Sequence, residues 1–413
     1  MDAGPVDAGP VDAGPVDAGT PDGGPPDAGP DDAGVDAGLF CDDWACVLAG
    51  WPPEPLDAGS RLFSLISDVD AGVPPGPYGM LGWFGGVLLP TGKVLAVPHR
   101  ADHVLEIDPV ALTARPIGPT LTDPAERKWA GAVLSREGVV FALPYDASRI
   151  LRIDPADGGV ALWGPDLRTP DAGPGLGPLY AGGVLDAFGY LWAVPGNEWL
   201  PYPIIRVDLA TGAVQPFFTL ARHGGWWGMA RLPDDRLVSF PKDFLANGSH
   251  WVLEITPRAS FDSATVQVRL DFDAEDAGLS LQGSALTRDG VVLSVPSFRQ
   301  GAGLRYDSAD GGISTFPLPA VACGTIGTHG DGFVYSTPDE DLKVLRLASD
   351  GGVVAFTSPF GTLNDRYGWL GFVATRAGLV GIPSNRPEVL ILNPGVAESR
   401  SLEVLLSPYF NKL

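Results

Sequence analysis

The sequence predicts an all-β fold made of seven copies of one four-stranded unit, and three observations carry this prediction. A short apolar run that ends in Pro recurs at intervals of 42 to 55 residues: Pro98, Pro144, Pro195, Pro241, Pro296, Pro338 and Pro383. The runs before these prolines, such as VVFAL and YLWAV, are rich in β-branched and aromatic residues, as strands are. No comparable helical period occurs. A repeat of about 45 residues predicts a seven-bladed β-propeller with four antiparallel strands per blade, because one blade cannot bury both faces alone.

The first strand of each unit is marked by an aromatic residue followed two positions later by Gly. The Gly precedes the repeated Pro by thirteen residues in five units, at Gly85, Gly131, Gly182, Gly228 and Gly283. The seventh unit is one residue shorter and has Gly371 at this place, whereas the sixth unit has Thr325 instead of Gly. Two positions ahead lie Trp83, Trp129, Tyr180, Trp226, Leu281, Cys323 and Trp369. Because an aromatic residue recurs here in five units, we interpret it as packing between blades rather than as a ligand platform.

The third strand follows a loop after the repeated Pro and ends near Asp or its replacement. These ends are Asp108, Asp154, Asp208, Thr256, Asp307, Ala348 and Asn393. Turn sequences such as DPADGG then lead to a fourth strand such as GVALWG. The seven blades are therefore expected at 81–118, 127–164, 178–219, 225–272, 280–318, 322–358 and 367–406.

Ring closure is expected to depend on a strand from the beginning of the chain. RLFSLIS (61–67) has the pattern of a fourth strand without the first three. We predict that it pairs with the outer edge of the last blade, because an open end would leave an unpaired strand edge. SLEVLL (401–406) competes for the same place, and the two segments can lie side by side.

Three regions of different composition define the domains. Residues 1–38 repeat Asp-Ala-Gly-Pro and lack the apolar side chains of a core, so we expect a disordered spacer rather than a calcium site. Residues 39–60 are a bridging segment with Trp44 and Trp51, expected to pack on the body, and 61–413 form the propeller. Cys41 and Cys46 are close enough to bridge, but spacing leaves a disulfide and two free thiols equally open.

The overall charge limits the partners. The formal net charge is −23, and nine of the carboxylates precede residue 39. An acidic surface repels phosphate backbones and anionic lipids, so we predict no nucleic-acid partner and no membrane insertion, and we expect a monomer. The Asp-Ala-Gly-Pro tract resembles linkers of secreted bacterial proteins. This resemblance implies an extracellular or cell-envelope location, although the chain shows no signal peptide.

Candidate binding residues come from the loops that break the repeat. In a propeller, the loops between second and third strands share one face with the connections between blades, and function usually lies there. The longest inserts are GNEWLPYP (196–203) and KDFLANGSHW (242–251), with RHGG (222–225) nearby. Their candidate ligand-binding residues are Asn197, Glu198, Trp199, Tyr202, Arg222, His223, Phe244, His250 and Trp251. Aromatic rings beside amides and a carboxylate suit sugar or peptide recognition, but such loops could equally fold over their own aromatics and seal the blade edge.

The sequence predicts no catalytic residue, no metal ligand and no cofactor. His99 and His103 are four residues apart, but in a loop that spacing has no geometric meaning for metal binding. DFDAEDAG (271–278) concentrates carboxylates without the Asp/Asn-then-Gly order of a calcium-binding loop.

Two units carry a resemblance to a known superfamily. GYLWAVPGNEWLPYPIIRVDLATGAVQPF and GVVFALPYDASRILRIDPADGGVALW resemble blades of the seven-bladed NHL and streptogramin-lyase-like propellers, and the likeness covers nearly all of 81–406. Those lyases rely on a paired Glu and His with magnesium, and no Glu-x-x-His occurs in this chain, so no catalytic residue carries over. We expect a binding module that recognises a glycan, peptide or protein through the loop face. The alternatives are a metal-dependent hydrolase or lyase at the central channel and an architectural surface protein.

Overall fold

The computed structural model describes most of the repeat region and short pieces of both ends. The described residues are 41–49, 62–67, 81–168, 178–196, 202–219, 225–242, 251–269, 281–296, 302–319, 323–338, 343–359, 367–394 and 405–409. Residues 1–40, for which we expect a disordered spacer, and Trp51 lie outside these ranges.

The described strands form seven separate four-stranded antiparallel sheets. The first blade contains β2 (Trp83–Leu88), β3 (Val94–Pro98), β4 (Val104–Asp108) and β5 (Thr113–Ile117), and the second contains β6 (Trp129–Leu134), β7 (Val140–Pro144), β8 (Ile150–Asp154) and β9 (Gly159–Trp163). The third blade contains β10 (Tyr180–Leu185), β11 (Leu191–Pro195), β12 (Pro203–Val207) and β13 (Val214–Thr219). The fourth contains β14 (Ala230–Arg231), β15 (Leu237–Ser239), β16 (Val252–Pro257) and β17 (Ala264–Arg269). The fifth blade contains β18 (Leu281–Leu286), β19 (Val291–Pro296), β20 (Ala302–Asp307) and β21 (Ile313–Pro317). The sixth contains β22 (Cys323–Thr328), β23 (Val334–Pro338), β24 (Lys343–Leu347) and β25 (Val353–Thr357). The seventh contains β26 (Trp369–Thr375), β27 (Gly378–Pro383), β28 (Val389–Asn393) and β1 (Leu62–Ile66).

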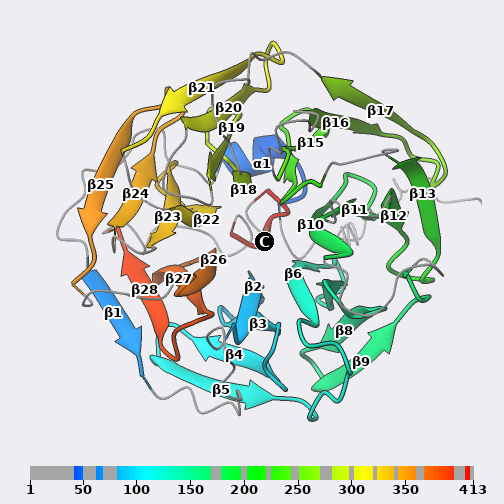
Figure 1. Ribbon diagram of the computed structural model, residues 1–413, viewed down its shortest axis with the longest axis vertical. Helices are drawn as coiled ribbons and strands as arrows, with labels where there is room; N and C mark the ends of the chain where they lie inside the picture. Colours follow the sequence, from blue (N-terminus) through cyan, green and yellow to red (C-terminus); the bar gives the residue numbers. More distant parts are fainter. Residues whose placement is uncertain are drawn as a thin grey trace, which may run out of the picture. The chain divides into compact units, whose positions relative to one another are not determined.

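The sheets form a closed ring around a central axis (Figure 1). The innermost strands contact one another in the order β2, β6, β10, β14, β18, β22 and β26, and β26 contacts β2 again. This arrangement confirms the all-β, seven-bladed propeller with four antiparallel strands per blade that the repeats predict.

The ring is closed by the strand from the beginning of the chain, as predicted. β1 pairs antiparallel with β28, with Leu62 opposite Asn393 and Ile66 opposite Val389. The seventh blade therefore combines β26, β27 and β28 with β1 at its outer edge. Of the competing segment 401–406, Leu405 and Leu406 lie in a buried helical turn, and 401–404 are outside the described ranges.

The repeated Gly is required by the approach of neighbouring blades. Gly131 and Gly228 have φ angles of 69° and 79°, which side chains disfavour, and the pairing register of β6 with β7 shifts at the same point. A Cβ atom on Gly182 would lie 2.5 Å from the Cα atom of Gly228 in the next blade. Thr325 replaces Gly in the sixth blade, and its hydroxyl accepts a hydrogen bond from the backbone N–H of Gly371.

The repeated aromatic residue is buried and ties the first strand to the third. The indole Nε1 of Trp129 donates to the carbonyl oxygen of Arg149 at 2.8 Å, just before β8 begins. Trp83, Trp226 and Trp369 donate in the same way at 2.9, 3.1 and 2.8 Å. Because the indole N–H is satisfied within the blade and the ring is buried, this position serves packing.

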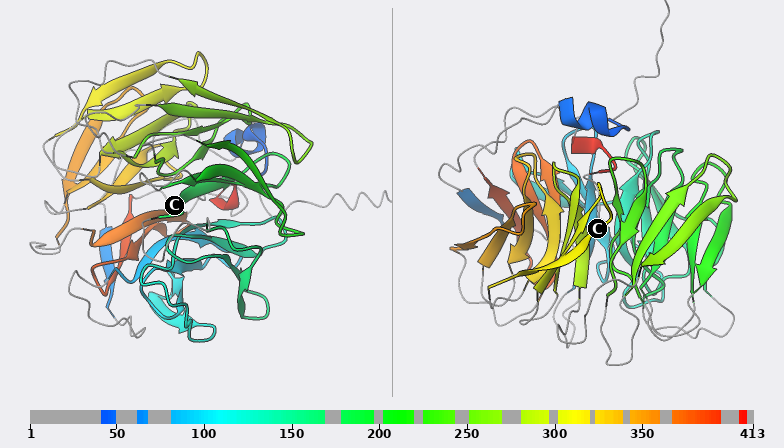
Figure 2. Two further views of the ribbon diagram at one scale, coloured as in Figure 1. Left: turned by 45° about the vertical axis from the view of Figure 1, so that its right-hand side comes forward. Right: turned by 90° about the horizontal axis from the view of Figure 1, so that it is seen from above.

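One end of the central channel is covered by segments from both ends of the chain. The loops of each blade divide between two faces: the turn face has the first-to-second and third-to-fourth strand turns, and the loop face has the other connections. Helix α1 (Trp44–Ala49) and residues 405–409 lie together on one face near the axis (Figures 1 and 2). We call Cys41–Ala49 with Leu405–Tyr409 the terminal cap.

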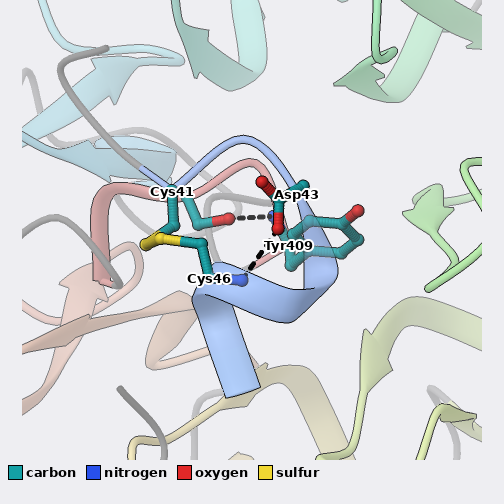
Figure 3. Close-up of a disulfide and its surroundings, with 5 residues drawn as sticks. Cys41, Asp43, Cys46 and Tyr409 are labelled. Atoms are coloured by element: carbon teal, nitrogen blue, oxygen red, sulfur yellow. Dashed lines mark hydrogen bonds between the residues drawn. A yellow bond between two sulfur atoms is a disulfide. The ribbon is translucent and has the colours of Figure 1, made fainter. Parts of the chain in front are cut away.

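Side-chain contacts place the terminal cap on the turn face. Cys41 and Cys46 form a disulfide with their Cα atoms 5.5 Å apart, and Asp43 Oδ1 accepts a 2.8 Å hydrogen bond from Cys46 N (Figure 3). Asp42 pairs with Arg136, in the first-to-second strand turn of the second blade, and with Arg231, which ends β14 just before the corresponding turn of the fourth blade. In the part of the chain that is described, no helix is long and apolar enough to span a bilayer.

Candidate functional site

The loop-face end of the channel is filled by side chains of the blades themselves. The residues that follow the repeated aromatic position are Phe84, Ala130, Ala181, Trp227, Gln282, Gly324 and Leu370. Five of these seven join Tyr145 in one buried group, which we call the mouth cluster: Phe84, Ala130, Tyr145, Ala181, Trp227 and Leu370. Because four of these five lie in the first strands of different blades and Trp227 lies just before β14, the mouth cluster lies where the blades converge on the axis.

Aromatic rings from three blades meet in the mouth cluster. Phe84 stacks on Trp227 with ring centroids 5.7 Å apart, and Tyr145 lies 6.3 Å from Trp227. The imidazole of His99 packs edge-on to Tyr145 at 4.8 Å and to Phe84 at 5.4 Å. The first, second and fourth blades therefore supply a common aromatic floor at this end of the channel.

His99 in this floor is a neutral acceptor at physiological pH. The ring is buried, and its Nδ1 lies 2.8 Å from the carbonyl oxygen of Trp129. Burial lowers the pKa of His99 from 6.5 to about 3, so the neutral ring must carry its proton on Nδ1 to donate to that carbonyl. Nε2 then remains as an acceptor. A base with so low a pKa is poorly matched to proton abstraction near neutral pH.

Several buried polar atoms around the mouth cluster lack a hydrogen-bond partner among the described residues. They are Nε1 of Trp227, Oε1 of Gln282 and Oγ of Ser384. Gln282 occupies the same repeat position as Phe84, and Ser384 follows its Pro as His99 and Tyr145 follow theirs. Native proteins rarely leave such groups unsatisfied, so these atoms mark a place where water or a ligand completes the structure.

A cavity of about 610 Å³ opens on the loop face beside the mouth cluster. Its lining comes from the loops of the first and second blades and includes Leu81, Arg100, Arg127, Asp146 and Arg168. We call it the loop pocket. Leu81 also packs against the mouth cluster, and the Arg127 guanidinium lies 5.1 Å from the ring of Tyr145. The loop pocket and the mouth cluster are thus adjacent parts of one site.

Ion pairs organise the polar wall of the loop pocket. Arg100 pairs with Glu126 at 2.7 Å, and Arg127 pairs with Asp146 at 2.8 Å. The Asp146 side chain is 3% exposed, and burial raises its pKa against the opposing effect of Arg127. Oδ1 of Asp146 and Nε of Arg100 are buried without a partner among the described residues. The pocket therefore offers one unsatisfied acceptor and one unsatisfied donor.

The structure describes two of the nine residues that the sequence singled out as ligand-binding candidates. Tyr202 is 3% exposed, with its ring 6.4 Å from that of Tyr180. Trp251 is half-buried, and its carbonyl oxygen accepts the indole hydrogen bond of Trp226. The other seven lie outside the described ranges: Asn197, Glu198, Trp199, Arg222, His223, Phe244 and His250.

The residues of the loop pocket were missed because they stand in short loops of ordinary length. A usable signal was nevertheless present in the repeat. The residue that follows the repeated Pro is His99 in the first blade, Tyr145 in the second and Lys242 in the fourth. Side chains at this position reach the mouth cluster. Asp146 follows directly after Tyr145. Within the described ranges, no group of three or more His, Cys, Asp or Glu side chains is arranged to hold a metal ion.

Known proteins resemble this chain in fold. No family model matches it, and no curated protein matches it in sequence. Virginiamycin B lyase from Staphylococcus aureus superposes with a TM-score of 0.63 at 15% identity, covering 81% of this chain and 99% of that chain. A catalytically inactive variant of that lyase with quinupristin gives 0.62 at 14% identity, covering 81% and 99%. A further streptogramin B lyase structure gives 0.61 at 15% identity, covering 81% and 98%.

These comparisons confirm the resemblance that the blade sequences indicate. The chain has the seven-bladed propeller fold of the streptogramin B lyases. At such low identity the likeness concerns the fold alone, because one fold supports many functions.

Proposed function

We propose that this protein is a binding module that holds a glycan on the loop face, in the loop pocket and against the mouth cluster. The observation that carries the proposal is the loop pocket itself. Its volume of about 610 Å³ suits a small ligand or one end of a longer one. Asp146 and Arg100 each present a buried polar atom without a partner among the described residues.

The chemistry of these atoms favours a polyhydroxylated ligand. A sugar hydroxyl both donates and accepts, so vicinal hydroxyls can donate to Asp146 Oδ1 and accept from Arg100 Nε. Nε1 of Trp227 and Oε1 of Gln282 offer a second donor and acceptor beside the aromatic floor. The pairing of Arg100 with Glu126 and of Arg127 with Asp146 leaves the wall electrically balanced, which suits a neutral polyol. A peptide, whose amides also donate and accept, is the second ligand class.

Asp146→Asn tests the proposal directly. A glycan array with the wild-type protein identifies the ligand, and isothermal titration calorimetry then compares affinities. We expect at least a tenfold loss for Asp146→Asn, because a hydrogen bond to a charged group contributes about 1.5–3 kcal/mol. The wild-type affinity should also fall as pH drops toward the raised pKa of Asp146, and the variant should lack this dependence.

Glu106→Gln is the matched control. Glu106 is a half-buried carboxylate held by Lys93 and Arg115 in the first blade, away from the loop pocket lining. Its replacement should leave glycan affinity unchanged. Equal losses in both variants, or binding only to peptides, would contradict the glycan proposal.

A metal-dependent hydrolase or lyase at the central channel is the alternative function, and the fold likeness to streptogramin B lyases is what supports it. A thermal shift assay with magnesium distinguishes it, because an ion that binds only the folded state raises the melting temperature. Turnover of the glycan identified above would favour the alternative over simple binding. An architectural surface protein would show neither ligand binding nor magnesium-dependent stabilisation.

A further inference from the structure

Guanidinium groups join neighbouring blades on the turn face, and they do so in a recurring way. Arg206 of the third blade donates to the carbonyl oxygens of Ser260 at 2.7 Å and Arg258 at 2.8 Å in the fourth blade. Arg236 of the fourth blade donates to the Ser308 carbonyl at 2.7 Å in the fifth. Arg305 of the fifth blade donates to the Ser349 carbonyl at 2.8 Å in the sixth. Each arginine reaches the turn between the third and fourth strands of the next blade.

At the interface between the second and third blades, Arg136 donates to the Ala187 carbonyl at 2.9 Å, in the first-to-second strand turn of the third blade. Among the described residues, no arginine of the second blade bonds the turn between the third and fourth strands of the third blade. Arg152 lies two residues before Asp154 on β8, as Arg206 and Arg305 do on β12 and β20 before their own aspartates. Its Nη2 pairs with Asp154 at 2.8 Å within its own blade, and no hydrogen bond joins it to the described turn of the third blade. A cavity of about 470 Å³ opens at this interface. We call it the turn pocket.

Aromatic rings and carboxylates line the turn pocket. Phe188 is 43% exposed, which is unusual for a phenylalanine, and Trp163 and Tyr190 lie beside it in the lining. The remaining wall includes Glu137 and Asp208.

The charges of the turn pocket are uneven. Its two arginines, Arg136 and Arg152, are each paired with an aspartate, Asp42 and Asp154 respectively. Glu137 has no ion pair with any residue that the structure describes. The turn pocket therefore holds uncompensated negative charge on a chain that is already strongly acidic.

We propose that the turn pocket binds a basic side chain of a partner peptide, with a guanidinium group as its best occupant. At the interface between the third and fourth blades, a guanidinium bonds turn carbonyls and also lies over the ring of Tyr190, which lines the turn pocket as well. Arg206 is 4.3 Å from the ring centroid of Tyr190, and Arg346 is 4.5 Å from that of Phe333. A cation over such rings gains attraction that an uncharged isostere lacks. The acidic surface also draws a basic peptide toward the protein.

The test compares a blocked peptide that contains one arginine with the same peptide carrying citrulline, which keeps the shape and removes the charge. Saturation-transfer NMR with the full chain should detect the arginine peptide, and the citrulline peptide should bind at least tenfold more weakly. Glu137→Gln and Phe188→Ala should each weaken the arginine peptide at least threefold. Both positions are exposed on turns, so these variants are expected to fold.

Two control variants separate this site from the loop face. Glu126→Gln removes an exposed carboxylate on the loop face and should leave the peptide affinity unchanged, as should Asp146→Asn. Equal binding of the citrulline peptide, or equal loss in Glu126→Gln and Glu137→Gln, would overturn the proposal. Because the loop-pocket variant is included, failure here and failure of the glycan proposal give different results.

Discussion

The two ends of the central channel are closed by different means. At the turn-face end, the terminal cap brings main-chain segments from both ends of the sequence over the axis (Figure 2). At the loop-face end, the mouth cluster fills the channel with side chains of the blades. The turn-face end therefore depends on contacts between distant parts of the chain, whereas the loop-face end is a product of the repeat itself.

The two ends also differ in how their polar groups are satisfied. Arg231 is buried beneath the terminal cap and bonds Asp42 Oδ1 at 3.0 Å, the Asp42 carbonyl at 2.7 Å and Asp235 at 2.7 Å. Its guanidinium lies 4.8 Å from the ring of Tyr409. At the mouth cluster, in contrast, Trp227 and Gln282 keep buried polar atoms unpaired among the described residues. A fully paired end contributes stability, and an unpaired end marks the place where a ligand can add hydrogen bonds.

Trp129→Ala shows how much stability is lost when a packing residue that belongs to neither end is removed. Its indole is fully buried within the second blade and bonded to the Arg149 carbonyl. We expect a loss of about 3–5 kcal/mol in the free energy of unfolding, because a large cavity remains. Urea unfolding followed by circular dichroism measures the loss. Ligand binding lost at unchanged stability would show that this position is part of a site and not of the packing.

Arg231→Met tests the turn-face end. We expect the free energy of unfolding to fall by about 2–3 kcal/mol, because the variant removes several charge-assisted hydrogen bonds at once. The carboxylates of Asp42 and Asp235 are partly exposed and can be hydrated, which limits the loss. Glycan affinity on the loop face should stay within twofold of wild type. A large loss of affinity would mean that the two ends are coupled through the blades.

The pH dependence of stability tests the buried histidine at the loop-face end. The pKa of His99 is lowered from 6.5 to about 3 in the folded protein, so below pH 6.5 the unfolded chain takes up a proton that the folded chain does not. Stability from this group is complete above pH 6.5 and is lost as pH falls, by about 2 kcal/mol between pH 6.5 and 5. His99→Gln should remove this contribution, so its curve should be flatter than that of wild type by the same amount. Identical slopes in the two proteins would mean that His99 becomes charged without cost.

The repeat made the fold predictable because each blade repeats the same local rules. An aromatic residue, a Gly two positions later and a Pro at the end of the second strand recur together. A unit that departs from this pattern at one position can therefore still be recognised from the other units. The closing strand β1 was predictable for the same reason, since 62–66 has the pattern of a fourth strand without partners nearby.

The site was less predictable because it depends on contacts between units. Asp42 and Arg231 are 189 residues apart and belong to no repeated pattern. The loop pocket forms where short loops of two blades meet, and Asp146 gains its role only from burial against Arg127. Long inserts drew attention to Tyr202, but its ring is buried, as in the alternative in which such loops fold over their own aromatics. The cysteine spacing left the bridge open, and the structure has Cys41 and Cys46 joined.

Gln282→Met is expected to have the smallest effect on stability, and it allows a direct comparison of the two ends. It introduces methionine at the loop-face end, as Arg231→Met does at the turn-face end. Gln282 is 6% exposed, and its Oε1 has no partner among the described residues. Methionine has a similar shape and no amide, so the cost of burying an unsatisfied oxygen disappears. We expect the free energy of unfolding to rise by about 1 kcal/mol, opposite in sign to the effect at Arg231.

The same variant should weaken glycan binding while it stabilises the fold. If Oε1 of Gln282 accepts a hydrogen bond from the ligand, its loss should lower the affinity about three- to tenfold, as expected for one neutral hydrogen bond. Denaturant unfolding and calorimetric titration of one preparation give both values. A stabilised protein with unchanged affinity would place the ligand away from the mouth cluster, while leaving the loop pocket as its site. A destabilised protein would show that water already satisfies Gln282, and the contrast between the two ends would then concern hydration rather than ligand binding.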